Sequence, residues 1–241
     1  MEAGQESHEN RFAIRVGGAL RTFPGATAFK WGLAMPDLRP ITVVNVGYRS
    51  TNSWVVSAGT SRLLVDPGWA GSAGTLLATL DRKGIPVAEV RHGLATHYHP
   101  DHAGAAQDLK RRGMRLIVVE EQLDAIPRLA RWMKPADRYT TIETHDNIVL
   151  SCADSRAFLA GIGFAGEIVH TPGHSDDSVT LVLDDGRAFT GDLTPEAMVG
   201  GEDPAVVARS WQRLRDLKVT SIYPGHGPPR AMPTAVRAAP E

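Results

Sequence analysis

The chain has 241 residues, of which 42% are hydrophobic and 22% charged, so its length and composition are those of an ordinary globular protein. Lys and Arg number 26 against 27 Asp and Glu, and a net charge of −1 lacks the basic excess of nucleic-acid and membrane-surface binders. The single cysteine, Cys152, excludes an internal disulfide framework and fits a reducing compartment. We expect one cytoplasmic domain over residues 1–241, without a nucleic-acid or membrane partner.

The two ends of the chain differ in composition from the rest. Residues 1–10 are polar and lack the basic start and apolar centre of a signal peptide. Residues 228–241 contain several prolines and no apolar periodicity. No run between them approaches the ~18–20 apolar residues of a membrane span. We therefore predict flexible ends at 1–10 and 228–241.

Apolar runs and turn residues predict strands and helices that alternate along the chain. The predicted strands cover residues 41–48, 53–57, 62–65, 90–96, 115–119, 141–150, 157–159, 167–170, 178–183, 187–190 and 219–223. The predicted helices cover residues 73–82, 104–112, 121–133 and 204–217. This order is typical of a layered α/β domain with sheet inside and helices outside.

Four short segments share one design, in which an apolar strand runs straight into a loop that carries histidine or acidic side chains. They are L-A-T-H-Y-H-P-D-H (94–102), E-I-V-H-T-P-G-H-S (167–175), R-A-F-T-G-D (187–192) and S-I-Y-P-G-H-G (221–227). Six of the nine histidines lie in these segments. Loops that leave rigid strand ends can converge on a common site.

The first of these segments offers four ligands within six residues: His97, His99, Asp101 and His102. Imidazole and carboxylate together suit zinc, manganese or iron, and the absence of thiolate disfavours a structural zinc site. Alternate residues of a loose turn can point to two neighbouring positions. The segment therefore predicts ligands for two metal ions.

The other three segments complete the predicted ligand set. We favour His174, beyond the T-P-G turn, as a ligand, and interpret His170 as a packed histidine. Asp192 offers a carboxylate that can bridge two metals, and His226 lies between two glycines that let the backbone approach closely. The hypothesis is one metal held by His97, His99 and His174, a second held by Asp101, His102 and His226, and Asp192 between them. Three ligands for each metal and a bridge leave an open position, as in catalytic sites.

The motifs H-Y-H-P-D-H, T-P-G-H, F-T-G-D and Y-P-G-H, in this order and spacing, resemble the metallo-β-lactamase-fold hydrolase superfamily. The resemblance runs from about Ile41 to Gly227. It implies a four-layer αββα sandwich with a dinuclear site, usually two zinc ions, with iron or manganese as alternatives. It also implies that Asp66, in L-V-D-P-G, supports the metal site without binding the metal.

Asp192 places the resemblance nearer to the glyoxalase II and lactonase branches, because zinc β-lactamases generally lack a bridging aspartate there. Acyl-homoserine lactonases carry a tyrosine soon after that aspartate, whereas this chain continues as G-D-L-T-P. Large nuclease branches carry an inserted domain for nucleic acid, for which this chain has neither the length nor the charge.

The predicted activity is hydrolysis of a carbonyl-centred ester, thioester, lactone or amide in a small-molecule substrate. Two metals would generate hydroxide at neutral pH, and Asp101 would orient it. One alternative is an oxidoreductase resembling the persulfide dioxygenases, which hold a single iron with the matches of His97, His174 and Asp192. A phosphodiesterase or nuclease on the same fold is a further alternative. For the substrate pocket the sequence offers Trp69 and Met198 as candidates, and it says nothing about oligomeric state.

Overall fold

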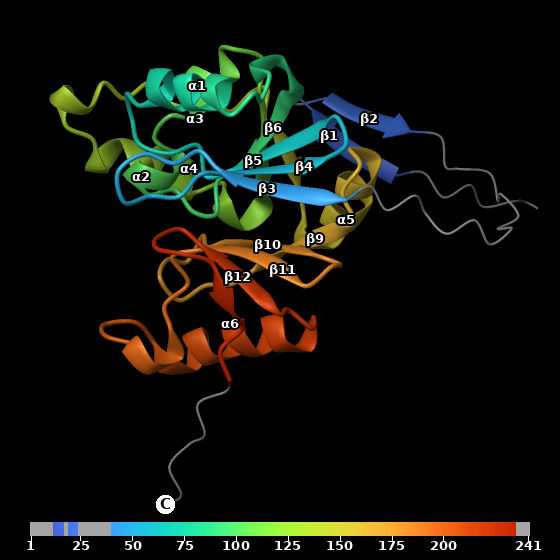
Figure 1. Ribbon diagram of the computed structural model, residues 1–241, viewed down its shortest axis with the longest axis vertical. Helices are drawn as coiled ribbons and strands as arrows, with labels where there is room; N and C mark the ends of the chain where they lie inside the picture. Colours follow the sequence, from blue (N-terminus) through green and yellow to red (C-terminus); the bar gives the residue numbers. More distant parts are fainter. Residues whose placement is uncertain (1–11, 17–18, 24–39, 235–241) are drawn as a thin grey trace, which may run out of the picture.

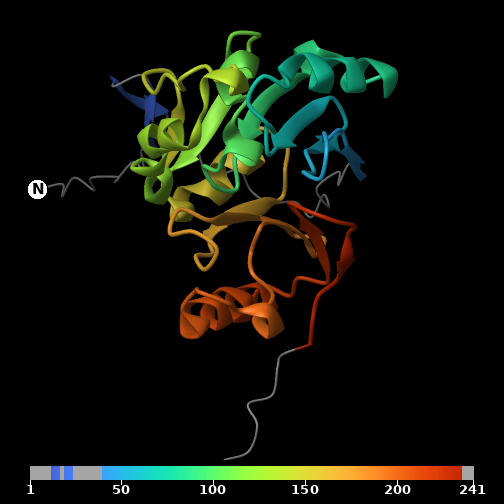
Figure 2. The same cartoon turned by 90° about the vertical axis from the view of Figure 1, so that its left-hand side faces the viewer.

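The protein is described by a computed structural model for residues 12–16, 19–23 and 40–234, and it consists of two stacked β-sheets between two layers of helices (Figure 1). The view turned by 90° shows the same order of layers (Figure 2). This is the αββα arrangement that the sequence predicts. Flexible ends are predicted at 1–10 and 228–241; residues 1–10 and 235–241 lie outside the described residues, whereas Arg230–Ala231 forms a short strand.

The larger sheet has eight strands in the order β2-β1-β8-β7-β6-β5-β4-β3. Its central strands β5, β6, β7 and β8 are parallel, and both flanks are antiparallel. The strands are β1 (Phe12–Val16), β2 (Ala19–Phe23), β3 (Ile41–Asn45), β4 (Trp54–Ala58), β5 (Ser61–Val65), β6 (Val90–Leu94), β7 (Arg115–Val119) and β8 (Ile148–Leu150).

The smaller sheet has five strands in the order β13-β12-β11-β10-β9. They are β9 (Gly166–His170), β10 (Val179–Leu183), β11 (Arg187–Gly191), β12 (Ser221–Pro224) and β13 (Arg230–Ala231). The predicted hairpin across D-D-G is present, with Leu181 opposite Phe189. β11 and β12 run parallel, so that Asp192 and His226 both follow strands that end at one edge of the sheet. β13 is a short edge strand within the segment 228–241.

Inner strands of the larger sheet such as β4 and β7 are buried on both faces, because helices cover one face and the second sheet covers the other. Along β7, Leu116 and Val118 pack among the helices, whereas Ile117 and Val119 pack between the two sheets. The period of two along a strand explains this division. A strand buried on both faces reads as a continuous apolar run, here L-I-V-V.

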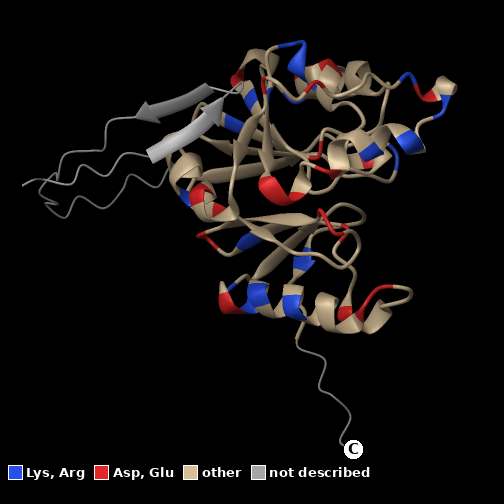
Figure 3. Ribbon diagram, turned by 180° about the vertical axis from the view of Figure 1, so that it is seen from behind, with Lys and Arg blue, Asp and Glu red and all other residues tan. Residues whose placement is uncertain are grey.

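Helices cover the outer faces of both sheets, whereas α5 packs Leu159 into the cluster between them. Helices α1, α3 and α4 contribute to the apolar cluster on the larger sheet, and α6 covers the smaller one with Trp211 at its centre. Figure 3 shows basic positions, coloured blue, along α6. The exposed basic residues of this helix include Arg209 and Arg213. The helices are α1 (Ala73–Arg82), α2 (Pro100–Ala103), α3 (Ala106–Lys110), α4 (Ala125–Leu129), α5 (Cys152–Gly161) and α6 (Pro204–Asp216), with 3-10 turns η1 (Val87–Glu89), η2 (Glu120–Gln122), η3 (Ala130–Trp132), η4 (Pro135–Asp137) and η5 (Glu196–Met198). Within the described part of the chain, no helix is long and apolar enough to cross a membrane.

The prediction of a strand at 157–159 is wrong, because these residues lie inside α5. The Ser151 hydroxyl accepts a hydrogen bond from the Asp154 backbone N–H at 3.2 Å and so caps the helix. Ser155 and Leu159, four residues apart, are the buried positions of α5. A short apolar run such as A-F-L cannot by itself distinguish a strand from one turn of a helix.

Other predicted boundaries differ from the structure as well, most clearly in three elements. Within 141–150 only Ile148–Leu150 forms a strand, and the predicted helix 121–133 is divided into η2, α4 and η3. The predicted helix 104–112 is shortened to α3 (Ala106–Lys110), because the Ala105 N–H bonds to Gly68 O at 3.0 Å rather than to the preceding turn. A Cβ at Gly104 would lie 2.3 Å from Ala70 N, so this close approach requires glycine.

Candidate metal centre

Seven side chains from loops that follow several strands meet at one edge of the two sheets. They form three overlapping groups, and within each group the ligand atoms lie within 4.8 Å of one another. The groups are His97, His99 and His174; His97, His102 and Asp192; and Asp101, His102 and His226. The structure therefore brings together every residue of the predicted ligand set, and the first and third groups are the two predicted triads.

The loop after β6 carries four of these side chains. Two carboxylates hold its backbone in place. The Asp66 carboxylate accepts hydrogen bonds from the Thr96 backbone N–H at 2.7 Å and from its hydroxyl at 2.9 Å. The Asp177 carboxylate accepts from the Tyr98 N–H at 2.7 Å. Pro100, at the first position of α2, turns the chain so that Asp101 and His102 follow on a helical turn.

The first triad is built around His99. His97 Nε2 and His174 Nε2 each lie 3.0 Å from His99 Nδ1. His97 is buried, and its Nδ1 lies 3.2 Å from the Thr96 hydroxyl. Burial, followed by the neighbouring histidines, lowers the pKa of His97 well below its ordinary value. The neutral imidazole that this favours is the form that binds a metal.

The second triad is built around His102, which is fully buried. His102 Nε2 lies 3.4 Å from Asp101 Oδ2 and 3.3 Å from Asp192 Oδ2. His226 Nε2 lies 3.2 Å and 3.3 Å from the same two oxygens. Asp192 Oδ2 is also 3.8 Å from His174 Nε2, so this carboxylate faces both triads.

The electrostatics of the second triad favour a positive charge. Burial alone would lower the pKa of His102, yet the charge of Asp66 and the Asp101 and Asp192 carboxylates beside Nε2 raise it well above its ordinary value. Burial would raise the pKa of Asp101, but His102 and Thr51 lower it below its ordinary range. Two ionised carboxylates thus face one buried imidazole, and a cation would neutralise them.

Two buried atoms of the cluster, His102 Nε2 and Asp192 Oδ1, have no hydrogen-bond partner among the described residues. A buried polar atom without a partner is costly and requires an explanation. A Cβ at Gly225 would lie 2.4 Å from Asp192 Oδ1 and 2.5 Å from the His102 ring, so the backbone itself closes this side of the cluster. Lone pairs of nitrogen and oxygen that point into one tight space fit a bound metal ion.

Several residues that the sequence analysis did not single out also contact the cluster. The Thr51 hydroxyl donates to Asp101 Oδ2 at 3.0 Å, and Ser50 O lies 2.8 Å from His226 Nδ1. The indole ring of Trp132, 64% exposed, lies 6.1 Å from the His99 ring. Ser50 and Thr51 lie in a loop and Trp132 lies on η3, each distant in sequence from its partner, so no local motif could have identified these contacts.

The remaining candidates of the sequence analysis occupy different places. Trp69 donates from Nε1 to the Thr51 hydroxyl at 3.1 Å, so it is linked to the cluster. Met198 lies on η5 and is 74% exposed, and its place in a substrate pocket stays a prediction. His170 is not part of the cluster, since its Nε2 lies 2.7 Å from Asp176 O, as expected for a packed histidine.

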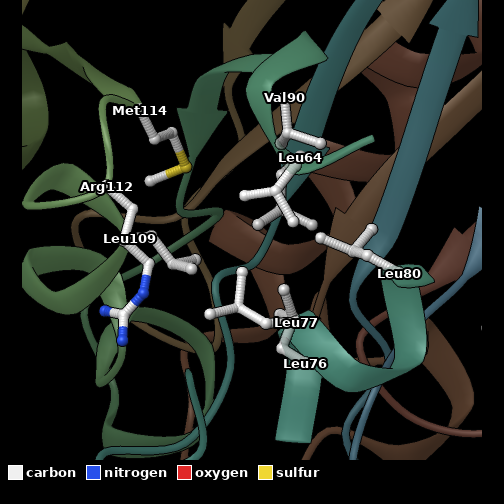
Figure 4. Close-up of a pocket in the computed structure, with 9 residues that line it drawn as sticks. Leu64, Leu76, Leu77, Leu80, Val90, Leu109, Arg112 and Met114 are labelled. Carbon is white, nitrogen blue, oxygen red and sulfur yellow. The ribbon is translucent and has the colours of Figure 1, made fainter. Parts of the chain in front are cut away.

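A small apolar depression lies elsewhere, between α1 and the end of α3 (Figure 4). Leu76, Leu77, Leu80 and Leu109 line it, and the Arg112 guanidinium lies at its rim. None of its lining residues is a histidine or a carboxylate. Side chains that could bind a metal therefore gather in the metal cluster and not in this depression.

A family model for the metallo-β-lactamase superfamily matches residues 46–226, a range that begins just before the Thr51 loop and ends on His226. The chain belongs to the metallo-β-lactamase superfamily. Among solved members, it resembles a family protein from Thermus thermophilus, TTHA1429, with a TM-score of 0.62, 24% identity, and 80% of this chain and 75% of that chain covered. It also resembles TTHA1623, crystallised in a di-iron-bound form, with a TM-score of 0.60, 25% identity, and 79% and 94% covered.

The curated relatives of this superfamily member are longer. A Beta-lactamase-like protein 2 homolog of Drosophila melanogaster is 27% identical over 180 residues, which cover 74% of this chain and 59% of that protein. An Atrochrysone carboxyl ACP thioesterase of Aspergillus fumigatus is 29% identical over 189 residues, which cover 74% of this chain and 38% of that protein. The chain thus spans less than two thirds of the length of these relatives.

Proposed function

We propose that this protein is a hydrolase that uses two divalent metal ions to cleave a carbonyl-centred ester, thioester, lactone or amide. The observation that carries the proposal is the pair of triads joined by Asp192, with His102 Nε2 and Asp192 Oδ1 buried and unpartnered among the described residues. A relative named as a thioesterase supports the acyl-transfer class of reaction.

The proposed ligands are His97, His99 and His174 for one ion and Asp101, His102 and His226 for the other, with Asp192 facing both. Two zinc ions are our first assignment, and iron or manganese would suit the same donors. Bound there, two divalent cations supply an activated water and a Lewis acid for the substrate carbonyl. Water adds its oxygen to the acyl carbon, and its protons go to the leaving group and to the solvent.

The residues of the chain have separate tasks in this reaction. The Asp101 carboxylate, held ionised and fixed by the Thr51 hydroxyl, accepts a hydrogen bond from the attacking water and orients it toward the carbonyl carbon. Asp66 holds the His102 ring through Nδ1, which leaves Nε2 directed into the cluster. Side chains of His174 and His226 are 28% and 40% exposed, so substrate reaches the site from their side.

Elemental analysis of the purified protein, beside a hydrolysis panel of thioesters, lactones, β-lactams and phosphodiesters, tests this proposal. We expect two metal ions per chain and turnover of at least one acyl substrate. His174→Ala should lose metal and activity, whereas His170→Ala and His145→Ala should keep both, because His170 lies outside the cluster and His145 is exposed. A single tightly bound iron with no hydrolysis would overturn the proposal and favour the persulfide dioxygenase-like alternative.

A further inference from the structure

The residues 48–51 form a tight hairpin loop at the rim of the metal cluster. Tyr48 and Thr51 pair as an antiparallel bridge, with the Thr51 N–H donating to Tyr48 O at 3.4 Å, so only two residues form the turn. The first of them, Arg49, has a φ of +59°. Two-residue hairpins with positive φ at the first turn position usually place glycine or asparagine there. An arginine in this conformation is strained, and the turn itself gives no reason for the side chain.

The loop is attached directly to the second triad. Thr51 pairs with His226 through a second bridge, and Ser50 O accepts from His226 Nδ1 at 2.8 Å. The Thr51 hydroxyl donates to Asp101 Oδ2 at 3.0 Å. The position of the Arg49 backbone is therefore fixed relative to the proposed metal ligands.

Two aromatic rings hold the Arg49 side chain. Its guanidinium carbon lies 5.4 Å from the centre of the Tyr48 ring and 5.5 Å from that of Trp69, within the range of a cation–π interaction. Trp69 is itself fixed, since its Nε1 donates to the Thr51 hydroxyl at 3.1 Å. Arg49 is exposed, and the ion pairs found among the described residues do not include it.

We propose that Arg49 binds an anionic group of the substrate, a carboxylate or a phosphate, while the scissile carbonyl lies at the metal cluster. The proposal rests on the proposed hydrolase function and adds a substrate class to it. The planar guanidinium matches carboxylate and phosphate oxygens with two parallel hydrogen bonds. Stacking on Tyr48 and Trp69 fixes the side chain before the substrate arrives, which reduces the entropy lost on binding.

Three thioesters of similar length distinguish a charge on either arm of the substrate from no charge. They are S-pentanoyl-N-acetylcysteamine, which is neutral, S-pentanoyl-3-mercaptopropionate, with an anionic leaving group, and S-succinyl-N-acetylcysteamine, with an anionic acyl group. We expect the wild-type metal-loaded protein to prefer one of the anionic esters. Arg49→Gly should lower kcat/KM for that ester about tenfold, mainly through KM, and change the neutral ester by less than about twofold.

The choice of glycine separates binding from folding. Arg49→Gly removes the guanidinium and also relieves the positive φ, so its melting temperature should not fall. Arg49→Lys should recover part of the preference. Arg82→Gln is the matched control, because Arg82 is an exposed arginine at the far end of the helix that follows the Trp69 loop. An equal loss on all three esters, or no loss on the anionic ones, overturns the proposal.

A second measurement does not depend on turnover. If none of the esters is cleaved, the hydrolase proposal fails for this substrate class, and calorimetry with three uncleavable thioethers still tests Arg49. We expect S-pentyl-3-mercaptopropionate or S-(3-carboxypropyl)-N-acetylcysteamine to bind the wild type more tightly than the neutral S-pentyl-N-acetylcysteamine, and Arg49→Gly to abolish the difference. A difference that survives Arg49→Gly, or its absence in the wild type, rejects Arg49 as the anion-binding residue.

Discussion

The His102 ring donates from Nδ1 to Asp66 Oδ2 at 2.9 Å, and this bond decides where its other nitrogen points. Asp66 is buried, and its φ of +59° is uncommon for a residue other than glycine. The same carboxylate binds the Thr96 N–H and hydroxyl. One strained aspartate therefore positions both the buried histidine of the second triad and the loop that carries His97 and His99 of the first.

Asp66→Asn is expected to weaken binding of the second metal about 10–100-fold. Asparagine tolerates the positive φ but carries no charge, and its amide cannot accept from both partners as the carboxylate does. Competition with a chelator of known affinity measures the change. Asp124→Asn, at an exposed position with no side-chain cap bond, should behave as the wild type. Unchanged metal affinity in Asp66→Asn would show that His102 is oriented by packing alone.

Asp101→Asn should separate metal binding from turnover. The amide keeps one oxygen toward the cluster but loses the charge and basicity with which Asp101 is proposed to orient water. We expect the first triad to keep its metal and turnover to fall by roughly 10²–10⁴-fold. Thr51→Val, which removes the hydroxyl that donates to Asp101 Oδ2, should cause a smaller loss. Near-normal turnover of Asp101→Asn would show that Asp101 is only a replaceable metal ligand and does not orient the water.

The ligands of the site are predictable from the sequence because each follows a recognisable apolar strand. His97, Asp192 and His226 come after β6, β11 and β12, whose ends lie at the same edge of the two stacked sheets, so that their loops meet. Contacts such as that of Thr51 with Asp101 link residues 50 positions apart through the tertiary fold. No local pattern encodes that pairing, so sequence reasoning does not reach it.

The fold is predictable where an element is long or bounded by turn residues, and less so where a short apolar run is ambiguous. Helix α6 begins with Pro204 after the capping residue Asp203, whose carboxylate accepts from the Ala205 N–H, and these signals are visible in the sequence. Helix α5 has a comparable cap in Ser151, but the run A-F-L within it is equally typical of a strand. The cap is the better guide there.

Ser151→Ala is expected to destabilise the protein by about 1 kcal/mol, the usual loss when a capping hydroxyl is removed. The bonds lost are that from the Asp154 N–H to the Ser151 hydroxyl at 3.2 Å and that from the hydroxyl to Asp154 Oδ2 at 2.7 Å. Denaturant unfolding monitored by circular dichroism measures the change. Metal content should not change, because α5 contributes no ligand. A loss below ~0.3 kcal/mol would mean that packing of Leu159 and the Ser155 bonds, not the cap, hold α5.

Gly225→Ala should damage the metal site while leaving the fold intact. Gly225 does not have a positive φ, so alanine introduces no backbone strain of that kind. Its methyl group would, however, lie 2.4 Å from Asp192 Oδ1 and 2.5 Å from the His102 ring. Both side chains must then move, and the ligand atoms facing the two triads would separate. We expect loss of at least one metal ion and of most activity, with a near-native circular dichroism spectrum.

Gly201→Ala provides the matched control for this steric effect. Gly201 is exposed, and a Cβ there would meet no atom within 4 Å, so metal content and activity should equal those of the wild type. Gly225→Ala with two metals bound and normal turnover would contradict the assignment of His102 and Asp192 as ligands, because that methyl group cannot be placed without displacing one of them. If Gly225→Ala loses metal and Gly201→Ala does not, metal binding depends on the contact of the Gly225 backbone with His102 and Asp192.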